Sequence, residues 1–245
     1  MGKVGLPTRV LPPYIHGSLE PRPGYRLNLL CNVACCHFLE PSQSSAFLAD
    51  ALRHVEEHGY TVSRHRYHPT NDFNVARCAA LNRRLSVALR SVILPTLGAA
   101  FGVAPSELLV RECFFVRYTP GAQSSLAPHR DGHLLSFNIL LSEPSSFDGG
   151  GTRFLGGVRP ALVRPERVGD LTIHCGKLLH EGVTVTRGVR YILVGFVDAV
   201  AQSARFDASF LSSRHANHSK AGPESDYIIV SKAWAHQNDD PEVIK

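Results

Sequence analysis

The spacing of apolar residues changes about half way along the chain. In residues 44–59, and again from about Asn74 to Ile93, apolar side chains recur at helical spacing, which predicts two amphipathic helices. Gly59 is a plausible end for the first helix, and Pro95 is expected to end or kink the second. From about residue 107 onward, short segments rich in β-branched and aromatic residues are separated by Gly, Pro, Asp or Ser. That pattern predicts a series of strands.

Several strands without intervening helices are typical of an antiparallel sandwich or barrel. Two helices followed by such a run suggest an α+β plan in which the helices pack on one sheet. We expect a flexible, proline-rich arm over residues 1–24 and a single domain over residues 25–245. The β core of that domain is expected over about residues 107–200, followed by a C-terminal extension over residues 201–245. Within the extension, residues 225–234 can add an edge strand.

Composition and charge narrow the choice of partners only slightly. With 44% hydrophobic and 19% charged residues, the chain has the composition of an ordinary globular domain. The formal net charge of +5 is scattered along the sequence rather than gathered in a stripe, so we expect no nucleic acid as partner. The six cysteines form no CxxC pair and no disulfide framework, and we expect all of them to be reduced: Cys31, Cys35, Cys36, Cys78, Cys113 and Cys175.

The sequence favours a soluble intracellular location, in the cytoplasm or nucleus. No apolar stretch approaches the roughly 18 residues that a membrane span needs, so we expect no membrane partner. The first residues lack the continuous apolar core of a secretory signal. They also lack acidic residues before Glu20, which leaves an organelle transit peptide open.

The stretch APHRDGHLLSFNILL, residues 127–141, carries a candidate metal site. In an extended backbone His129 and Asp131 project from the same face and can point at one spot. His180, at the start of another predicted strand, can complete the set, because two histidines and one carboxylate are the ligands of non-haem Fe(II) oxygenases. His133 and His174 are expected to be hydrogen-bonded structural residues beside the site rather than ligands.

Arg190 lies ten residues after His180, on the returning strand of a predicted hairpin whose turn is residues 186–188. Strand alternation places it on one face with Ile192, Val194 and Phe196, so its guanidinium would enter an apolar cavity. A buried guanidinium needs a carboxylate partner, and the far carboxylate of 2-oxoglutarate provides one. The structural alternative is an internal ion pair with another residue of the chain, either Asp170 or Asp198.

Three segments together resemble a known family: RYTPGAQSSLAPHRD, SFNILLSEPSSFDGGGTRF and LLHEGVTVTRGVRYILVGFVD. They are similar to the catalytic domain of the prolyl 4-hydroxylase and procollagen lysyl hydroxylase branch of Fe(II)/2-oxoglutarate dioxygenases. The likeness covers roughly residues 112–198, and the combination of HxD, GGGTxF, HEG and RGxRY is far more specific than HxD alone.

The resemblance implies a double-stranded β-helix (a cupin-like jelly roll) with the N-terminal helices packed on one sheet. It implies that His129, Asp131 and His180 bind Fe(II) and that Arg190 anchors 2-oxoglutarate, the co-substrate. Tyr118 and Asn138 match family residues and are expected to line the co-substrate pocket. O₂ as oxidant and ascorbate as reductant are implied as well.

The leading functional hypothesis is hydroxylation of a prolyl or lysyl side chain in a peptide or protein. Two alternatives stay open: a hydroxylase of a free amino acid or small metabolite, and a catalytically inactive jelly-roll binding module. A nucleic-acid demethylase is disfavoured because no basic groove is evident. The substrate does not follow from the resemblance, since this chain has LLHEG where lysyl hydroxylases have HYHEG-like surroundings, and since the collagen enzymes work in the secretory pathway.

Two further segments have ambiguous patterns. Gly149–Gly151 resembles a phosphate-binding loop, but no helix follows it, so a tight connection between strands is the better interpretation. Residues 64–68, RHRYH, mix cations with an aromatic residue as a nucleic-acid patch does. We expect a solvated loop there, although a loop at this place can still cover the active site.

Overall fold

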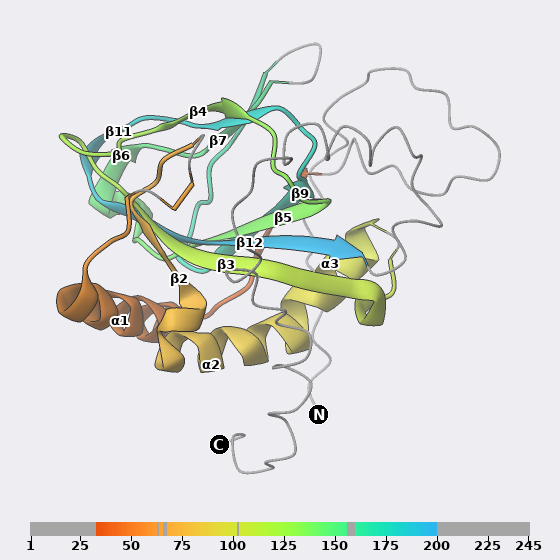
Figure 1. Ribbon diagram of the computed structural model, residues 1–245. Coiled ribbons are helices and arrows are strands. Elements are labelled where there is room, and N and C mark those ends of the chain that lie inside the picture. The colour runs from red at the N-terminus through yellow and green to blue at the C-terminus, as the bar shows by residue number, and fades with distance from the viewer. Residues whose placement is uncertain (1–32, 63, 66–67, 102, 156–159, 200–245) are drawn as a thin grey trace.

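The computed structural model describes residues 33–62, 64–65, 68–101, 103–155 and 160–199. The proline-rich arm predicted over residues 1–24, the extension predicted over residues 201–245 and the edge strand predicted within it lie outside these residues. The described part has the α+β plan expected from the sequence: antiparallel sheets, with helices on one side (Figure 1).

A six-stranded sheet forms the centre of the molecule. Its order is β1-β9-β5-β12-β3-β2, and every neighbouring pair is antiparallel. Because sequence neighbours are mostly not sheet neighbours, the strands alternate between this sheet and the smaller ones, as a jelly roll requires. The strands of this sheet are β1 (Val33–His37), β2 (Asp72–Asn74), β3 (Leu108–Tyr118), β5 (Leu135–Leu140), β9 (Asp170–Cys175) and β12 (Arg190–Ala199).

Two smaller sheets lie over one face of the large one, which we call the inner face (Figure 1). One has four strands in the order β4-β10-β7-β8, and the other pairs β11 with β6. Gly149–Gly151, with positive φ angles of 82°, 66° and 101°, connects β6 to β7, which confirms the tight strand connection. The strands of these sheets are β4 (Leu126–His129), β6 (Phe147–Gly149), β7 (Thr152–Phe154), β8 (Ala161–Val163), β10 (His180–Gly182) and β11 (Val185–Gly188).

The helices pack on the opposite, outer face of the large sheet (Figure 1). Alternation along the strands sends one set of side chains to this face, where they meet the apolar side of the helices and form the main core. The helical elements are α1 (Pro41–His58), the 3-10 turns η1 (Val75–Arg77), η3 (Pro105–Glu107) and η4 (Pro144–Ser146), α2 (Ala79–Ala88), a π-helical segment η2 (Leu89–Ile93) and α3 (Leu94–Phe101). Core residues include Leu81, Leu85, Leu89, Leu97, Phe115, Phe137, Ile139, Ile173 and Leu193.

The first helix follows its sequence signals closely. Pro41 occupies the first turn, and the backbone N–H of Glu40 donates to the side chain of Gln43 at 3.0 Å, which satisfies a donor at the helix start. Gly59, with φ 75°, ends the helix, and its N–H donates to the carbonyl of Val55 at 2.8 Å. The predicted end of this helix is therefore confirmed.

The second predicted helix, from about Asn74 to Ile93, is wrong at both ends. Residues 72–74 form β2 instead, and the Asn74 side chain accepts from the N–H of Ala76 at 2.9 Å, which starts a separate 3-10 turn. Helix α2 begins only at Ala79. Toward its end the helix does not stop at Pro95 but changes to π spacing over η2 and continues as α3, which accommodates a residue that has no N–H to donate.

The continuous helical stretch Ala79–Phe101 is long and apolar enough to cross a membrane by length and composition alone, contrary to the expectation that no segment approaches that length. In the structure its apolar side belongs to the main core. The predicted turn at residues 186–188 is also wrong: they belong to β11, which pairs with β6. Three of the six cysteines have described side chains, and all three are free and buried: Cys78, Cys113 and Cys175.

Candidate metal and co-substrate site

Three side chains predicted as metal ligands converge between β4 and β10. His129 ends β4 and His180 begins β10, and the two are register partners across these antiparallel strands. Asp131 follows β4, with its oxygens 3.5 Å from His129 Nε2 and 3.8 Å from His180 Nε2. One potential ligand atom from each of the three lies within 4.8 Å of the others, a spacing that one metal ion can bridge.

Backbone contacts orient the two imidazoles. Nδ1 of His129 lies 2.8 Å from the carbonyl of Ala127, and Nδ1 of His180 lies 2.8 Å from the carbonyl of Leu178. A proton on each Nδ1 satisfies these carbonyls and leaves each Nε2 as the atom that can bind a metal ion beside Asp131. The hydroxyl of Ser136, on β5, donates to Asp131 and fixes its carboxylate.

The electrostatics of the three residues suit a divalent cation. Burial opposes ionisation of Asp131, but the hydrogen bond with His129, the nearby His180 and the hydroxyl of Ser136 together hold the pKa of this carboxyl well below its usual range. Burial, reinforced by the neighbouring imidazole of His174, lowers the pKa of His180 to about 4. Burial also works against protonation of His129, but its hydrogen bond to Asp131 and the charge of that residue outweigh burial and raise its pKa. At neutral pH the site therefore offers an anionic carboxylate beside a neutral imidazole.

Arg190 is a buried cation at one end of the inner face. It is 3% exposed, and it opposes Tyr118 on the neighbouring strand β3, with the guanidinium carbon 5.7 Å from the Tyr118 ring centroid. Its Nε and Nη2 are buried and have no hydrogen-bond partner among the described residues. Burial lowers the pKa of Arg190 and raises that of Tyr118 to about 12. Two buried N–H groups without an acceptor are costly, so the site is complementary to a ligand oxygen.

The surroundings of Arg190 agree with the predicted alternation. Ile192 belongs to a small apolar cluster on the inner face, and Val194 and Phe196 pack against it. The internal alternative is not observed. Asp198 pairs with Arg111 at 2.9 Å and with His133 at 3.2 Å, whereas Asp170 accepts from backbone N–H groups of Glu166 and Arg167.

Tyr118 lies beside Arg190 and also reaches β10, the strand that carries His180. A Cβ placed on Gly182 would lie 3.6 Å from the Tyr118 hydroxyl, so this hydroxyl reaches across to β10. Gly182 follows His180 by two residues on that strand, which is about 7 Å along an extended backbone. Tyr118 therefore lies between Arg190 and the strand that carries His180.

A cavity of about 230 Å³ also reaches Arg190. It is lined by Phe147, Gly149, Gly151 and Arg164 among other residues, and none of the three triad residues is among those that line it. The cavity therefore reaches Arg190 but not the triad. A Cβ on Gly150 would lie 2.9 Å from Cδ of Arg190, so the glycine-rich connection lets the backbone approach this side chain.

The other predicted residues lie around the triad. Asn138, on β5, is 7% exposed and lies on the inner face between Ser136 and Leu140, and its Oδ1 has no hydrogen-bond partner among the described residues. The ring centroid of His174 lies 4.7 Å from that of His180, and its Nδ1 contacts the carbonyl of Cys175 at 3.0 Å. His133 interacts with Asp198. His174 and His133 therefore support the site from outside the triad.

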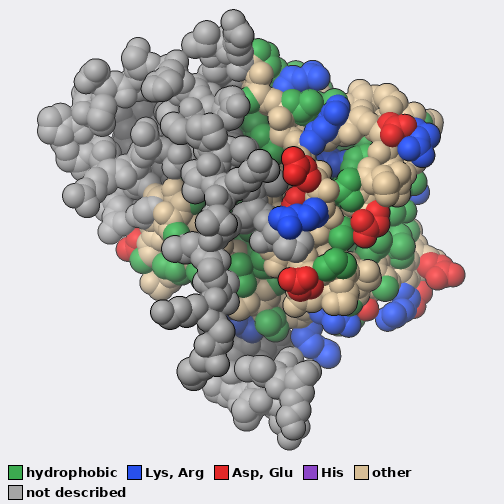
Figure 2. Space-filling model, turned by 180° about the vertical axis from the view of Figure 1, so that it is seen from behind, with side chains coloured by type: hydrophobic (Ala, Val, Ile, Leu, Met, Phe, Trp, Pro, Cys, Tyr) green, Lys and Arg blue, Asp and Glu red, His purple; other side chains and the backbone are tan. Residues whose placement is uncertain are grey.

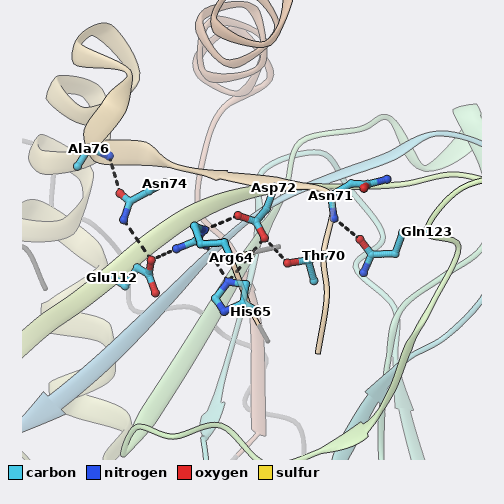
Figure 3. A network of polar contacts seen from close by, with 9 residues as sticks. All are labelled: Arg64, His65, Thr70, Asn71, Asp72, Asn74, Ala76, Glu112 and Gln123. Atoms are coloured by element: carbon cyan, nitrogen blue, oxygen red, sulfur yellow. Dashed lines mark hydrogen bonds and ion pairs between the residues drawn. The ribbon is translucent and has the colours of Figure 1, made fainter. Parts of the chain in front are cut away.

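The sequence did not reveal a polar cluster at the β2–β3 edge of the inner face (Figure 3). Arg64 donates from Nε to the buried Asp72 at 2.6 Å and from Nη1 to Glu112, so its side chain does not belong to a solvated loop as expected. Nearby, the ring centroid of His68 lies 4.9 Å from that of His129. The members of the cluster are 8 and 48 residues apart and share no motif, so no local pattern could have predicted them.

No protein-family model matches the chain. The human procollagen-lysine,2-oxoglutarate 5-dioxygenase 1 is 44% identical over 88 residues, which are 35% of this chain and 12% of that protein. The chain therefore spans only a small part of the length of this relative. Such a local match shows similarity of one region and leaves the activity of the whole protein to be proposed.

Solved structures share the fold. A prolyl-4-hydroxylase from Pseudomonas putida superposes with a TM-score of 0.53 and 21% identity, covering 68% of this chain and 92% of that one. An oxidoreductase of the 2OG-Fe(II) oxygenase family from Burkholderia pseudomallei has a TM-score of 0.56 and 18% identity, covering 68% and 85%. Together with the sequence match, they confirm the resemblance to Fe(II)/2-oxoglutarate dioxygenases and the jelly-roll fold.

Proposed function

We propose that this chain is an Fe(II)- and 2-oxoglutarate-dependent dioxygenase that hydroxylates an unactivated C–H bond. The observation that carries the proposal is the pairing of a His–Asp–His triad with Arg190, a buried cation whose Nε and Nη2 lack partners among the described residues. A metal site alone fits many functions. A metal site accompanied by a buried guanidinium with unpaired N–H groups fits far fewer.

The donor set suits Fe(II), because two imidazoles and one carboxylate leave coordination positions open for other ligands. Bound iron and 2-oxoglutarate supply the chemistry that activates O₂ and couples the oxidation of 2-oxoglutarate to succinate and CO₂ with hydroxylation. His129, Asp131 and His180 would hold the metal. Arg190 would bind the far carboxylate through its unpaired N–H groups, and Tyr118 would flank it.

Other residues of the chain prepare this pocket. Asn138 presents its amide toward the co-substrate, and an amide can turn so that its NH₂ donates. The apolar cluster around Ile192 and Leu140 keeps water from the Arg190 end, where a dry environment strengthens a charge-assisted contact. Ascorbate is proposed as the reductant that returns oxidised iron to Fe(II).

The proposed substrate is a prolyl or lysyl side chain of a peptide or protein. Its support is the 88-residue match to an enzyme whose name specifies procollagen lysine, and the structural likeness to a prolyl-4-hydroxylase. Hydroxylation of a free amino acid or small metabolite is the second candidate, because jelly-roll oxygenases share this site across many substrates.

Succinate formation from 2-oxoglutarate, with Fe(II) and ascorbate present, tests the activity. Mass spectrometry for +16 Da products across a peptide and metabolite library then identifies the substrate class. The matched control is Asp131→Ala. Absence of succinate from the wild-type chain, with metal bound, would leave the inactive binding module as the surviving hypothesis.

A further inference from the structure

Four rings form a continuous row across the inner face of the large sheet, which we call the aromatic row: His65, Phe114, Phe196 and His133. Successive ring centroids lie 4.9 Å apart for His65 and Phe114, 5.2 Å for Phe114 and Phe196, and 5.1 Å for Phe196 and His133. These separations are within the range of favourable ring contacts. The row therefore behaves as one packed surface.

The aromatic row ends beside the candidate metal site. Phe196 is the register partner of Ser136, whose hydroxyl donates to Asp131. His133 lies two residues after Asp131. Three of the four rings of the aromatic row are only partly buried: His65, Phe196 and His133. A side chain directed at the metal from this part of the inner face would therefore lie on these rings.

One end of the row is held in place by Arg64 (Figure 3). Its guanidinium bonds to Asp72 at 2.6 Å and to Glu112, and the guanidinium carbon lies 4.9 Å from the centre of the Phe114 ring. Asp72 is fully buried on β2, so this anchor point is rigid. Arg64 also contacts Nε2 of the adjacent His65 at 2.8 Å. Two charge-assisted contacts therefore hold Arg64, and Arg64 in turn contacts His65, which carries the outermost ring of the row.

We propose that the aromatic row receives the target side chain of a peptidyl substrate, and that Arg64 is the positioning residue that keeps His65 in the row. The proposal rests on the proposed function and deepens it by naming the surface that binds the substrate. Aliphatic CH groups of a prolyl ring or a lysyl chain pack well on ring faces, and a lysyl ammonium gains further attraction from them. The substrate class is thus a peptide with an aliphatic target side chain.

Binding and turnover are measured separately. Fluorescein-labelled peptides with one central lysyl or prolyl residue are titrated by fluorescence anisotropy against protein loaded with Mn(II) and 2-oxoglutarate, a form that needs no turnover. The same peptides are then assayed for kcat and KM with Fe(II). The variants are Arg64→Met, Arg64→Lys and Phe196→Leu. The matched control is Arg84→Met, which removes an Arg–Asp pair of the same 2.6 Å length, to Asp50, in the helical layer.

Arg64→Met is expected to weaken peptide binding about tenfold and to raise KM by a similar factor with kcat nearly unchanged, since it removes binding rather than chemistry. Phe196→Leu should act in the same direction. Arg64→Lys should recover part of the loss, because an ammonium keeps the charge without the fork geometry. Arg84→Met should match wild type, and the affinity for Mn(II) and 2-oxoglutarate should be retained in every variant.

If Arg64→Met and Phe196→Leu both had the same KM for peptide as the wild-type protein, the inference would be overturned. It would also be overturned by failure of both peptides to bind the wild-type protein, even if that protein forms succinate. In that second case the dioxygenase proposal stands and only the assignment of the row falls. Conversely, peptide binding that depends on Arg64 without succinate formation would support the row and contradict the proposed activity.

Discussion

His129 and His180 are 51 residues apart in sequence but face each other across β4 and β10, with ring centroids 4.3 Å apart. This register places both Nε2 atoms beside Asp131, so a metal ion would be bound by a strand pair and the segment that follows β4. The three side chains belong to none of the hydrophobic core clusters, and loss of one should therefore reduce metal affinity more than stability.

Accordingly, Mn(II) should raise the Tm of the wild-type protein and leave that of Asp131→Ala unchanged. An ion at about 100 times its Kd stabilises a folded protein by about 2.7 kcal/mol, which is readily visible by calorimetry. Asp148→Ala, which removes an exposed carboxylate paired with Arg187, is the control and should respond to Mn(II) as wild type does. An Mn(II)-induced shift in Asp131→Ala equal to that of wild type would contradict the assignment.

Arg190→Met should cost about 2–4 kcal/mol of co-substrate binding, or roughly 30- to 1000-fold in 2-oxoglutarate affinity, by removing a charge-assisted contact. Arg190→Lys should retain part of the affinity. Because Nε and Nη2 of Arg190 lack partners among the residues that the structure describes, the co-substrate-free Met variant should be at least as stable as wild type. Calorimetric titration of 2-oxoglutarate at saturating Mn(II), with a thermal melt of the same samples, checks both expectations. A destabilised variant with unchanged 2-oxoglutarate affinity would indicate a structural role.

Acidification should destabilise the metal-free protein partly through His65. Burial, helped by the neighbouring Arg64 and opposed by Asp72, lowers the pKa of His65 to about 4 from the ordinary value of 6.5. The unfolded chain therefore binds a proton more readily, and the stability that neutral His65 contributes above pH 6.5 is lost as the pH falls toward 4. The Tm of wild type should drop over this interval, and His65→Gln should drop less. His58→Gln, at an exposed position on α1, should follow wild type; an identical slope in His65→Gln would refute the expectation.

Gly195 on β12 is the register partner of Phe137 on the neighbouring strand β5 and leaves room for the Phe137 ring. A Cβ on Gly195 would lie 2.1 Å from the Phe137 ring, and Phe137 is fully buried between the sheet and the helices. Gly195→Ala should therefore cost about 1–3 kcal/mol through overpacking, measured by urea denaturation. The double variant Gly195→Ala/Phe137→Leu should lose less unfolding free energy than the two single variants lose together, because the smaller side chain relieves the clash. Strict additivity would show that the ring is not the cause.

The sequence predicted those parts of the fold and site that depend on short-range periodicity. The i, i+2 spacing of His129 and Asp131 and the alternation that buries Arg190 both follow from extended backbone, and the structure brings His129 and Asp131 together with His180 and buries Arg190 on the inner face. The first helix followed from apolar residues at helical spacing, and its end followed from Gly59.

Features that depend on tertiary contacts were not predictable in this way. Strand β2 has only three residues and is held by pairing with β3, so its local pattern was mistaken for the start of a helix. The Arg64–Asp72–Glu112 cluster joins segments far apart in sequence, and each member alone has the pattern of a solvated charge. Likewise, residues 186–188 resemble a turn until β6 is available as a partner.

The two halves of the site belong to different sheets. The imidazole ligands are on the small sheet, in β4 and β10, whereas Arg190 and Asn138 project from the large one. A dicarboxylate that binds the metal at one end and Arg190 at the other would therefore act as a tie between two layers that the backbone hydrogen bonds leave separate. Binding of the dicarboxylate should slow amide hydrogen exchange in β10 and β12 together, so that the co-substrate would stabilise the contact between the two sheets before it reacts.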